Sequence, residues 1–204
     1  MSIIEQKYHM SKKQKRGDSL PPLQRKIILC LARHGALTIN ECVRKIKHQY
    51  KATWIAFQSL KKKGLIKEVS SKVYRGNEYP QFWLTEEGIL LSFIEGASKD
   101  DLLEKSKTFY PKDENLHAFL DFASIFNPEI WKIAYYSIKR KGKLEPLDLA
   151  MIMITQMESD VNLEKFKEGL TKLKKYPEIL ESFNKLMEGL DKVKEFVKEV
   201  MGHE

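Results

Sequence analysis

Between residues 20 and 64, apolar positions recur every three or four residues, the spacing at which side chains share one face of a helix. A first helix is expected to begin at Pro21-Pro22 and to stop at Gly35. A second follows the N-cap candidate Thr38, and a third follows a turn through residues 47–50 and stops at Gly64. The three apolar stripes are, in order, Leu23, Ile27, Cys30 or Leu31 and His34; Ile39, Cys42, Val43 and Ile46; and Thr53, Phe57 and Leu60.

After Gly64 the pattern changes from helical spacing to alternation. Residues 65–69 alternate as in a β-strand, residues 75–78 (Arg-Gly-Asn-Glu) have the composition of a turn, and residues 81–84 suit a returning strand. The segment predicts a β-hairpin directly after three short helices.

From residue 85 onwards the apolar spacing is helical almost throughout. Thr85 and Ser98 are N-cap candidates for helices that end near residues 95 and 108, and further helices are expected over 114–126, 128–141 and 146–158. The Met-Ile-Met-Ile run at 151–154 is expected in the core. Two long helices follow, separated at Pro177, with heptad-like apolar positions at Leu163, Phe166, Leu170 and Leu173, and at Leu180, Phe183, Leu190, Val193 and Val197. The fold class predicted is mainly α.

Charge divides the chain unequally. Residues 1–80 carry 18 Lys and Arg against five Asp and Glu, whereas residues 81–204 carry 18 against 23. Basic clusters gain affinity for nucleic acids by releasing the counterions condensed on phosphates, so the first half is expected to bind a polyanion. The alternative is a lysine-rich surface that is only solvated. Residues 1–19 are expected to be a flexible basic arm, whose cations are Lys12, Lys13, Lys15 and Arg16.

Several other classes of protein find little support in the composition. No apolar run approaches the ~20 residues of a membrane span, and the N-terminus has only an Ile-Ile pair where a signal peptide needs an apolar run of ~7–15 residues. We therefore expect a cytoplasmic protein that does not enter the membrane. Cys30 and Cys42, on apolar faces of predicted helices, are expected to be buried hydrophobes, with a disulfide as the alternative.

The sequence also gives no support to an enzyme. The five histidines are scattered, so we expect neither a metal nor another cofactor. Phosphate-binding glycine loops and nucleophile elbows are absent from the sequence. The acidic pairs Glu86-Glu87 and Asp100-Asp101 fall in first turns of predicted helices, where the helix dipole favours negative charge without any catalytic role.

Two stretches, taken in order, resemble the winged-helix DNA-binding domains of bacterial and archaeal transcription regulators. Residues 37–69 (LTINECVRKIKHQYKATWIAFQSLKKKGLIKEV) resemble the helix, turn, recognition helix and exit into the wing. Residues 82–94 (FWLTEEGILLSFI) resemble the strand that closes the wing and the helix after it. The resemblance covers about residues 20–95 and implies a winged-helix domain over 20–96. The helical spacing of the later apolar residues, and not the resemblance, predicts an all-helical domain over 97–204.

The resemblance also implies roles for individual residues. The third helix would lie in the major groove, with Gln58 reading adenine and with Ile55 and Trp54 contacting thymine methyl groups or sugars. The alternative for Trp54 is that its ring tucks against the wing as part of the core. Arg44, Lys45 and Lys47, together with Lys72 and Arg75 at the tip of the hairpin, would contact phosphates or a minor groove. The outward face of the third helix is predicted to be Lys51, Ala52, Trp54, Ile55, Gln58 and Lys62.

The last two helices alternate apolar stripes with Lys and Glu faces, a pattern typical of helices that pair with other helices. We expect a homodimer formed through them, with a bundle inside one chain as the alternative. A Met-rich helical domain could also admit an apolar effector, although no residue points to one. The function expected is sequence-specific binding of double-stranded DNA by a transcription regulator. The alternative is an architectural or replication and segregation module that binds DNA non-specifically or docks a protein partner.

Overall fold

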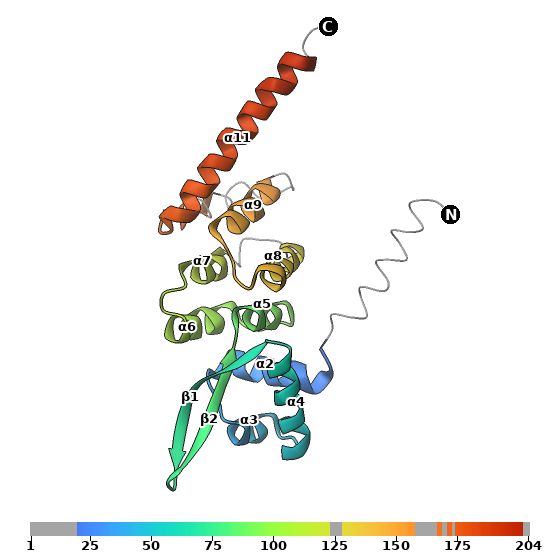
Figure 1. The fold of residues 1–204 in the computed structure, drawn as a ribbon, viewed down its shortest axis with the longest axis vertical. Helices are drawn as coiled ribbons and strands as arrows, with labels where there is room; N and C mark the ends of the chain where they lie inside the picture. Colours follow the sequence, from blue (N-terminus) through green and yellow to red (C-terminus); the bar gives the residue numbers. More distant parts are fainter. Residues whose placement is uncertain (1–19, 123–127, 158–166, 169–170, 173, 202–204) are drawn as a thin grey trace, which may run out of the picture.

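The computed structural model describes residues 20–122, 128–157, 167–168, 171–172 and 174–201. The predicted arm, and the heptad-like positions Leu163, Phe166, Leu170 and Leu173, lie outside this described part. The elements are stacked along one long axis (Figure 1). The β-hairpin projects at one end of this axis, and the last helix extends to the opposite end.

Three helices come first, as the apolar spacing predicts: α2 (Pro22–His34), α3 (Ile39–Ile46) and α4 (Tyr50–Lys62). Gly35 follows α2 with a φ of 78°, a conformation that suits glycine, and its N–H donates to the Leu31 carbonyl. Thr38 caps α3 in a capping box with Glu41. His34 was predicted on the apolar stripe of α2 but is exposed, as is the neighbouring Arg33, in the last turn of the helix.

The hairpin is longer than its apolar pattern predicts. Strand β1 (Ile66–Tyr74) pairs antiparallel with β2 (Asn77–Leu84), whereas the sequence pattern indicated strands over only 65–69 and 81–84. The outer part of the hairpin exposes both faces, so no apolar alternation marks it. Arg75 and Gly76, with φ values of 50° and 79°, form the two-residue turn that the twist of a hairpin favours. Leu37 bridges Phe82 and adds a short third segment beside β2.

Three helices, then a hairpin, form a winged helix, and an all-helical part follows it. Thr85 and Ser98 accept hydrogen bonds from backbone amides and cap their helices, as predicted. The helices after the hairpin are α5 (Glu86–Ile94), α6 (Lys99–Phe109), α7 (Glu114–Phe122), α8 (Pro128–Lys141), α9 (Pro146–Met157) and α11 (Pro177–Met201). Within the part of the chain that the structure describes, no helix is long and apolar enough to cross a membrane.

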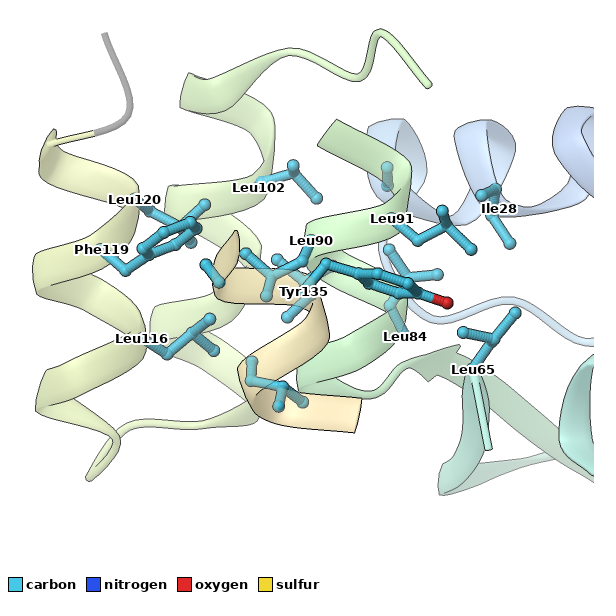
Figure 2. Packing of buried hydrophobic residues seen from close by; sticks show 14 of the residues in the cluster. Ile28, Leu65, Leu84, Leu90, Leu91, Leu102, Leu116, Phe119, Leu120 and Tyr135 are labelled. Atoms are coloured by element: carbon cyan, nitrogen blue, oxygen red, sulfur yellow. The ribbon is translucent and has the colours of Figure 1, made fainter. Parts of the chain in front are cut away.

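One buried cluster runs from the winged helix into the helical part. Ile28 of α2, Leu84 of β2 and Leu91 of α5 lie beside Tyr135 of α8, with Phe119 of α7 beyond them (Figure 2). The boundary predicted after residue 96 therefore remains a prediction, since buried side chains from both sides of it pack together. In the 151–154 run, Ile152 and Met153 are buried, but Met151 is 49% exposed, contrary to expectation, because it lies on the outer face of α9.

Candidate nucleic-acid interface

Helix α4 presents one face to the core and the other to solvent. Thr53 and Phe57 are buried, which confirms the predicted inner stripe, and the Gln24 amide donates to the Ser59 hydroxyl at 3.0 Å. Trp54 is 46% exposed and Ile55 is 53% exposed, so neither side chain belongs to the core. The exposed positions recur at helical spacing, and together they form what we call the reading face: Lys51, Trp54, Ile55, Gln58 and Lys62. Ala52, predicted to face outward with them, is half-buried.

The three lysines that end α4 point in different directions. The Lys61 ammonium lies 5.8 Å from the centre of the Phe82 ring, and the Lys63 ammonium donates to the Gln24 amide oxygen at 2.9 Å. Lys62 continues the reading face. Lys61 and Lys63 thus connect the end of α4 to β2 and α2, while the exposed ammonium of Lys62 lies at the end of the reading face.

Arg44, Lys45 and Lys47, which the sequence predicted as phosphate contacts, are exposed at the end of α3. Lys47 ends the helix in the left-handed conformation with a φ of 51°, and its N–H donates to the Val43 carbonyl. Lys45 lies close enough to α2 to affect His34 electrostatically. Desolvation lowers the pKa of His34, and the charges of Lys45 and Arg33 lower it further.

The structure separates the two basic residues that the sequence pattern placed at the tip of the wing. Arg75 occupies the turn, with its guanidinium carbon 5.3 Å from the centre of the Tyr74 ring. Lys72 lies within β1, and its ammonium is 2.6 Å from the Glu41 carboxylate of α3. The placement of Lys72 at the tip is therefore wrong, because the strands extend beyond it and turn its side chain towards α3.

Glu41 joins the wing to the start of α3. One carboxylate oxygen accepts from Lys72, and the other accepts from the Thr38 amide at 2.9 Å and from the Thr38 hydroxyl at 3.1 Å. Partial burial raises the pKa of the Glu41 carboxyl, but these hydrogen bonds outweigh burial and leave the pKa below its ordinary value. Glu41 is therefore held as an anion that both caps a helix and anchors the wing.

A groove of about 570 Å³ lies between the wing and α3. Tyr50 lines it from the start of α4, and Tyr74 and Tyr79 come from the two strands of the wing. Its other lining residues are Thr38, Asn40, Glu41, Val43, Arg44 and Lys72. These three tyrosines were not predicted as site residues from the sequence, although the period-two spacing of Lys72 and Tyr74 could have indicated that the strand continues to residue 74.

Cys30 and Cys42 are free thiols in the interface between α2 and α3, and both are buried, as predicted for small hydrophobes. They lie within hydrogen-bonding reach of each other. That hydrogen bond lowers the pKa of the Cys30 thiol and raises the pKa of the Cys42 thiol. Among the described residues, no group of three or more His, Cys, Asp and Glu side chains could hold a metal ion.

A second set of polar groups joins the base of the wing to the helical part. The Tyr110 hydroxyl donates to the Leu84 carbonyl at 2.6 Å, and the Lys67 ammonium lies 4.3 Å from the centre of the Tyr110 ring. Burial, followed by the neighbouring Asp113, raises the pKa of Glu86 to about 7. The sequence pattern predicted only an interaction with the helix dipole for Glu86, but its carboxyl also interacts with Asp113, the residue that precedes α7.

Comparisons with known proteins add little to this geometry. No protein-family model matches the chain, and no curated protein matches it. Among solved structures, the chain is similar to Lactococcus lactis ZitR, wild type, in complex with DNA, at 15% identity and a TM-score of 0.30. The match covers 70% of this chain and 97% of that chain. A similarity this low carries no inference about function, which has to be argued from the residues.

Proposed function

We propose that this chain binds double-stranded DNA as a sequence-specific transcription regulator, with α4 in the major groove. The observation that carries the proposal is the reading face, where Gln58 stands between two apolar residues and two lysines on one exposed stripe. An α-helix fits the major groove, where base pairs display distinguishable donors, acceptors and methyl groups. The Gln58 amide both donates and accepts, which matches adenine, whereas Ile55 and Trp54 match thymine methyl groups or sugars.

The cations around the reading face support the same proposal. Arg44, Lys45 and Lys47 are exposed at the end of α3, and Arg75 is exposed at the tip of the wing. In a winged-helix arrangement these side chains would lie on either side of the groove that α4 enters, where they would contact phosphates and fix the register without reading sequence. Lys72 would add less to affinity, because its ammonium is already paired with Glu41.

We further propose that the chain acts as a homodimer through its C-terminal helices. Helix α11 has 25 residues, which gives it a length of about 37 Å, and its far end extends beyond α9 (Figure 1). Leu147 and Met151, one helical turn apart on α9, are each 49% exposed. A second copy would cover these apolar side chains, and two wings held together would bind two half-sites with increased affinity.

Fluorescence anisotropy of a labelled duplex, titrated with the full chain across a salt series, tests DNA binding. If about five cations contact phosphates, the logarithm of the affinity should fall with the logarithm of the salt concentration with a slope of about −4 to −5. The absence of binding even at low salt would refute DNA binding and would favour an acidic protein as the partner of the basic face.

Selection from a random duplex library then tests specificity. A regulator should prefer its site about 10³-fold or more over random duplex. Gln58→Ala should reduce the sequence preference at one base pair, while Arg75→Ala should weaken binding to all sequences by the same factor. Equal losses on all sequences from Gln58→Ala, or no enrichment at all, would favour the non-specific architectural module. Sedimentation at micromolar concentration tests the dimer, and a strictly monomeric species would refute it.

A further inference from the structure

The groove between the wing and α3 is rich in exposed aromatic rings. Tyr50 is 51% exposed, Tyr74 is 58% exposed and Tyr79 is 36% exposed. Exposed large apolar groups that gather in one concave place, rather than being scattered, are typical of binding sites. The volume of the groove, about 570 Å³, lies within the range of roughly 300–1,000 Å³ that small-molecule sites occupy.

The hairpin register places the aromatic rings on one face of the wing. Lys72 pairs directly with Tyr79, and Tyr74 pairs directly with Asn77. Directly paired residues share a face, and so do residues two apart on one strand. Tyr74 and Tyr79 are therefore diagonal neighbours on the face that looks towards α3, where the Arg44 side chain lines the opposite wall. The guanidinium of Arg75 lies against the Tyr74 ring and adds a cation at the outer end.

Aromatic rings that line a groove with Arg44 in its wall and Arg75 against its outer tyrosine suit bases that have left the stack. In a continuous duplex both faces of each base are covered by its neighbours, so tyrosine rings can touch only sugars and phosphates. An unpaired base presents a free face, and stacking on an aromatic side chain is sequence-tolerant because every base has one. Arg44 and Arg75 would balance the phosphate charge of the same nucleotide.

We infer that this groove binds an unpaired nucleotide. The chain should therefore bind DNA with a bulge or another unstacked, unpaired base more tightly than it binds a continuous duplex. The inference rests on the proposed DNA binding and extends it. Helix α4 and the phosphate contacts hold the duplex part, while the tyrosine groove takes the unstacked base. The Lys72–Glu41 ion pair, 2.6 Å between the charged atoms, ties β1 to α3 and fixes the distance between the groove walls.

The test compares the affinity of the full chain for two duplexes of the same sequence, one continuous and one with a short bulge of unpaired thymidines. The bulged duplex should bind about tenfold tighter, within the range that base–aromatic stacking gives. A double variant, Tyr74→Phe with Tyr79→Phe, should keep the preference because the rings remain. The corresponding Ala double variant should lose it while binding the continuous duplex as before.

Tyr136→Ala is the matched control, because Tyr136 is an exposed tyrosine on α8, remote from the groove, at 46% exposure. It should leave the preference for the bulged duplex unchanged. Equal affinity for both duplexes, or a preference that survives the Ala double variant, would overturn the groove inference alone. Absence of binding to either duplex would instead refute the proposed function. Binding of single-stranded thymidines without duplex binding would support the groove and refute the regulator.

Discussion

Protonation of Glu86 should control the stability of the junction between the wing and the helical part. Its carboxyl faces Asp113, and its surroundings include Lys67, Tyr110 and the Leu144 backbone N–H. Burial is the largest cause that raises the pKa of Glu86 to about 7 from an ordinary value of 4.5, and Asp113 adds to it. Because the folded-state pKa is raised, the stability this group contributes is complete below pH 4.5 and is lost as the pH rises through 7.

Glu86→Gln keeps the shape of the side chain and removes its ionisation. The amide N–H can donate to Asp113 at every pH, and the amide oxygen can accept from Leu144, as the protonated acid does. One pKa unit corresponds to about 1.4 kcal/mol, but Glu86 is only half-buried and solvent screens part of its charge. We therefore expect the variant to match the parent near pH 4.5 and to be about 1–2 kcal/mol more stable at pH 8.

Urea unfolding of parent and variant at a series of pH values measures this difference, because the titrating groups that do not interact with Glu86 cancel in the comparison. Glu87→Gln is the matched control, since Glu87 stands next to Glu86 in the first turn of α5. The control should show a constant, small difference from the parent across the same range. A Glu86→Gln curve that runs parallel to the parent at all pH values, or a control with the same pH dependence, would refute the reasoning.

Four further substitutions test the fold. Gly88→Ala should lower the free energy of unfolding in urea by about 3 kcal/mol or more, because a Cβ there would lie 1.9 Å from the Leu65 carbonyl oxygen. Gly189→Ala in α11 should raise it by about 0.5–1 kcal/mol, because a Cβ there would have nothing within 4 Å. Trp83→Phe should cost about 2–3 kcal/mol, because the buried indole N–H donates to the Leu31 carbonyl at 3.1 Å; a melting temperature equal to the parent's would contradict this. Lys72→Met should lower the free energy of unfolding by less than about 1 kcal/mol at pH 7, because half of the side chain is exposed. This loss should vanish as the pH falls through the lowered pKa of Glu41, since the ion pair then no longer forms. A loss that persists at low pH would contradict the ion pair as its cause.

Local signals carried most of the secondary structure. A capping residue and its partner amide lie within three positions of each other, so the caps at Thr38, Thr85 and Ser98 can be predicted without the fold. The inner stripe of α4 follows for the same reason, since Thr53, Phe57 and Leu60 are one helical face. Once this inner stripe is assigned, the remaining positions of α4 give most of its exposed face, although Ala52 at the edge of that face is half-buried.

Tertiary contacts determined what the sequence pattern could not. Lys72 pairs with Glu41, which stands 31 positions earlier, and nothing in the spacing of the charges indicates that contact. Glu86 has the sequence context of an ordinary first-turn acid, and only the fold places Asp113, from the turn between α6 and α7, opposite its carboxyl. The tyrosine groove could not be predicted, because it forms where the outer part of the hairpin, which is exposed on both faces, lies beside α3.

The contacts at the base of the wing bear on how a dimer would recognise DNA. Trp83 of β2 donates to α2 and stacks its ring 4.5 Å from that of Phe109 in α6, and the adjacent Tyr110 donates to Leu84. The winged helix is thereby fixed to the helical layers above it, with α11 at the far end of the molecule (Figure 1). In the proposed dimer, the distance between two reading faces is then set by how the C-terminal helices pair. For half-sites one turn apart, the pairing has to bring the two copies of α4 to about 34–36 Å from each other.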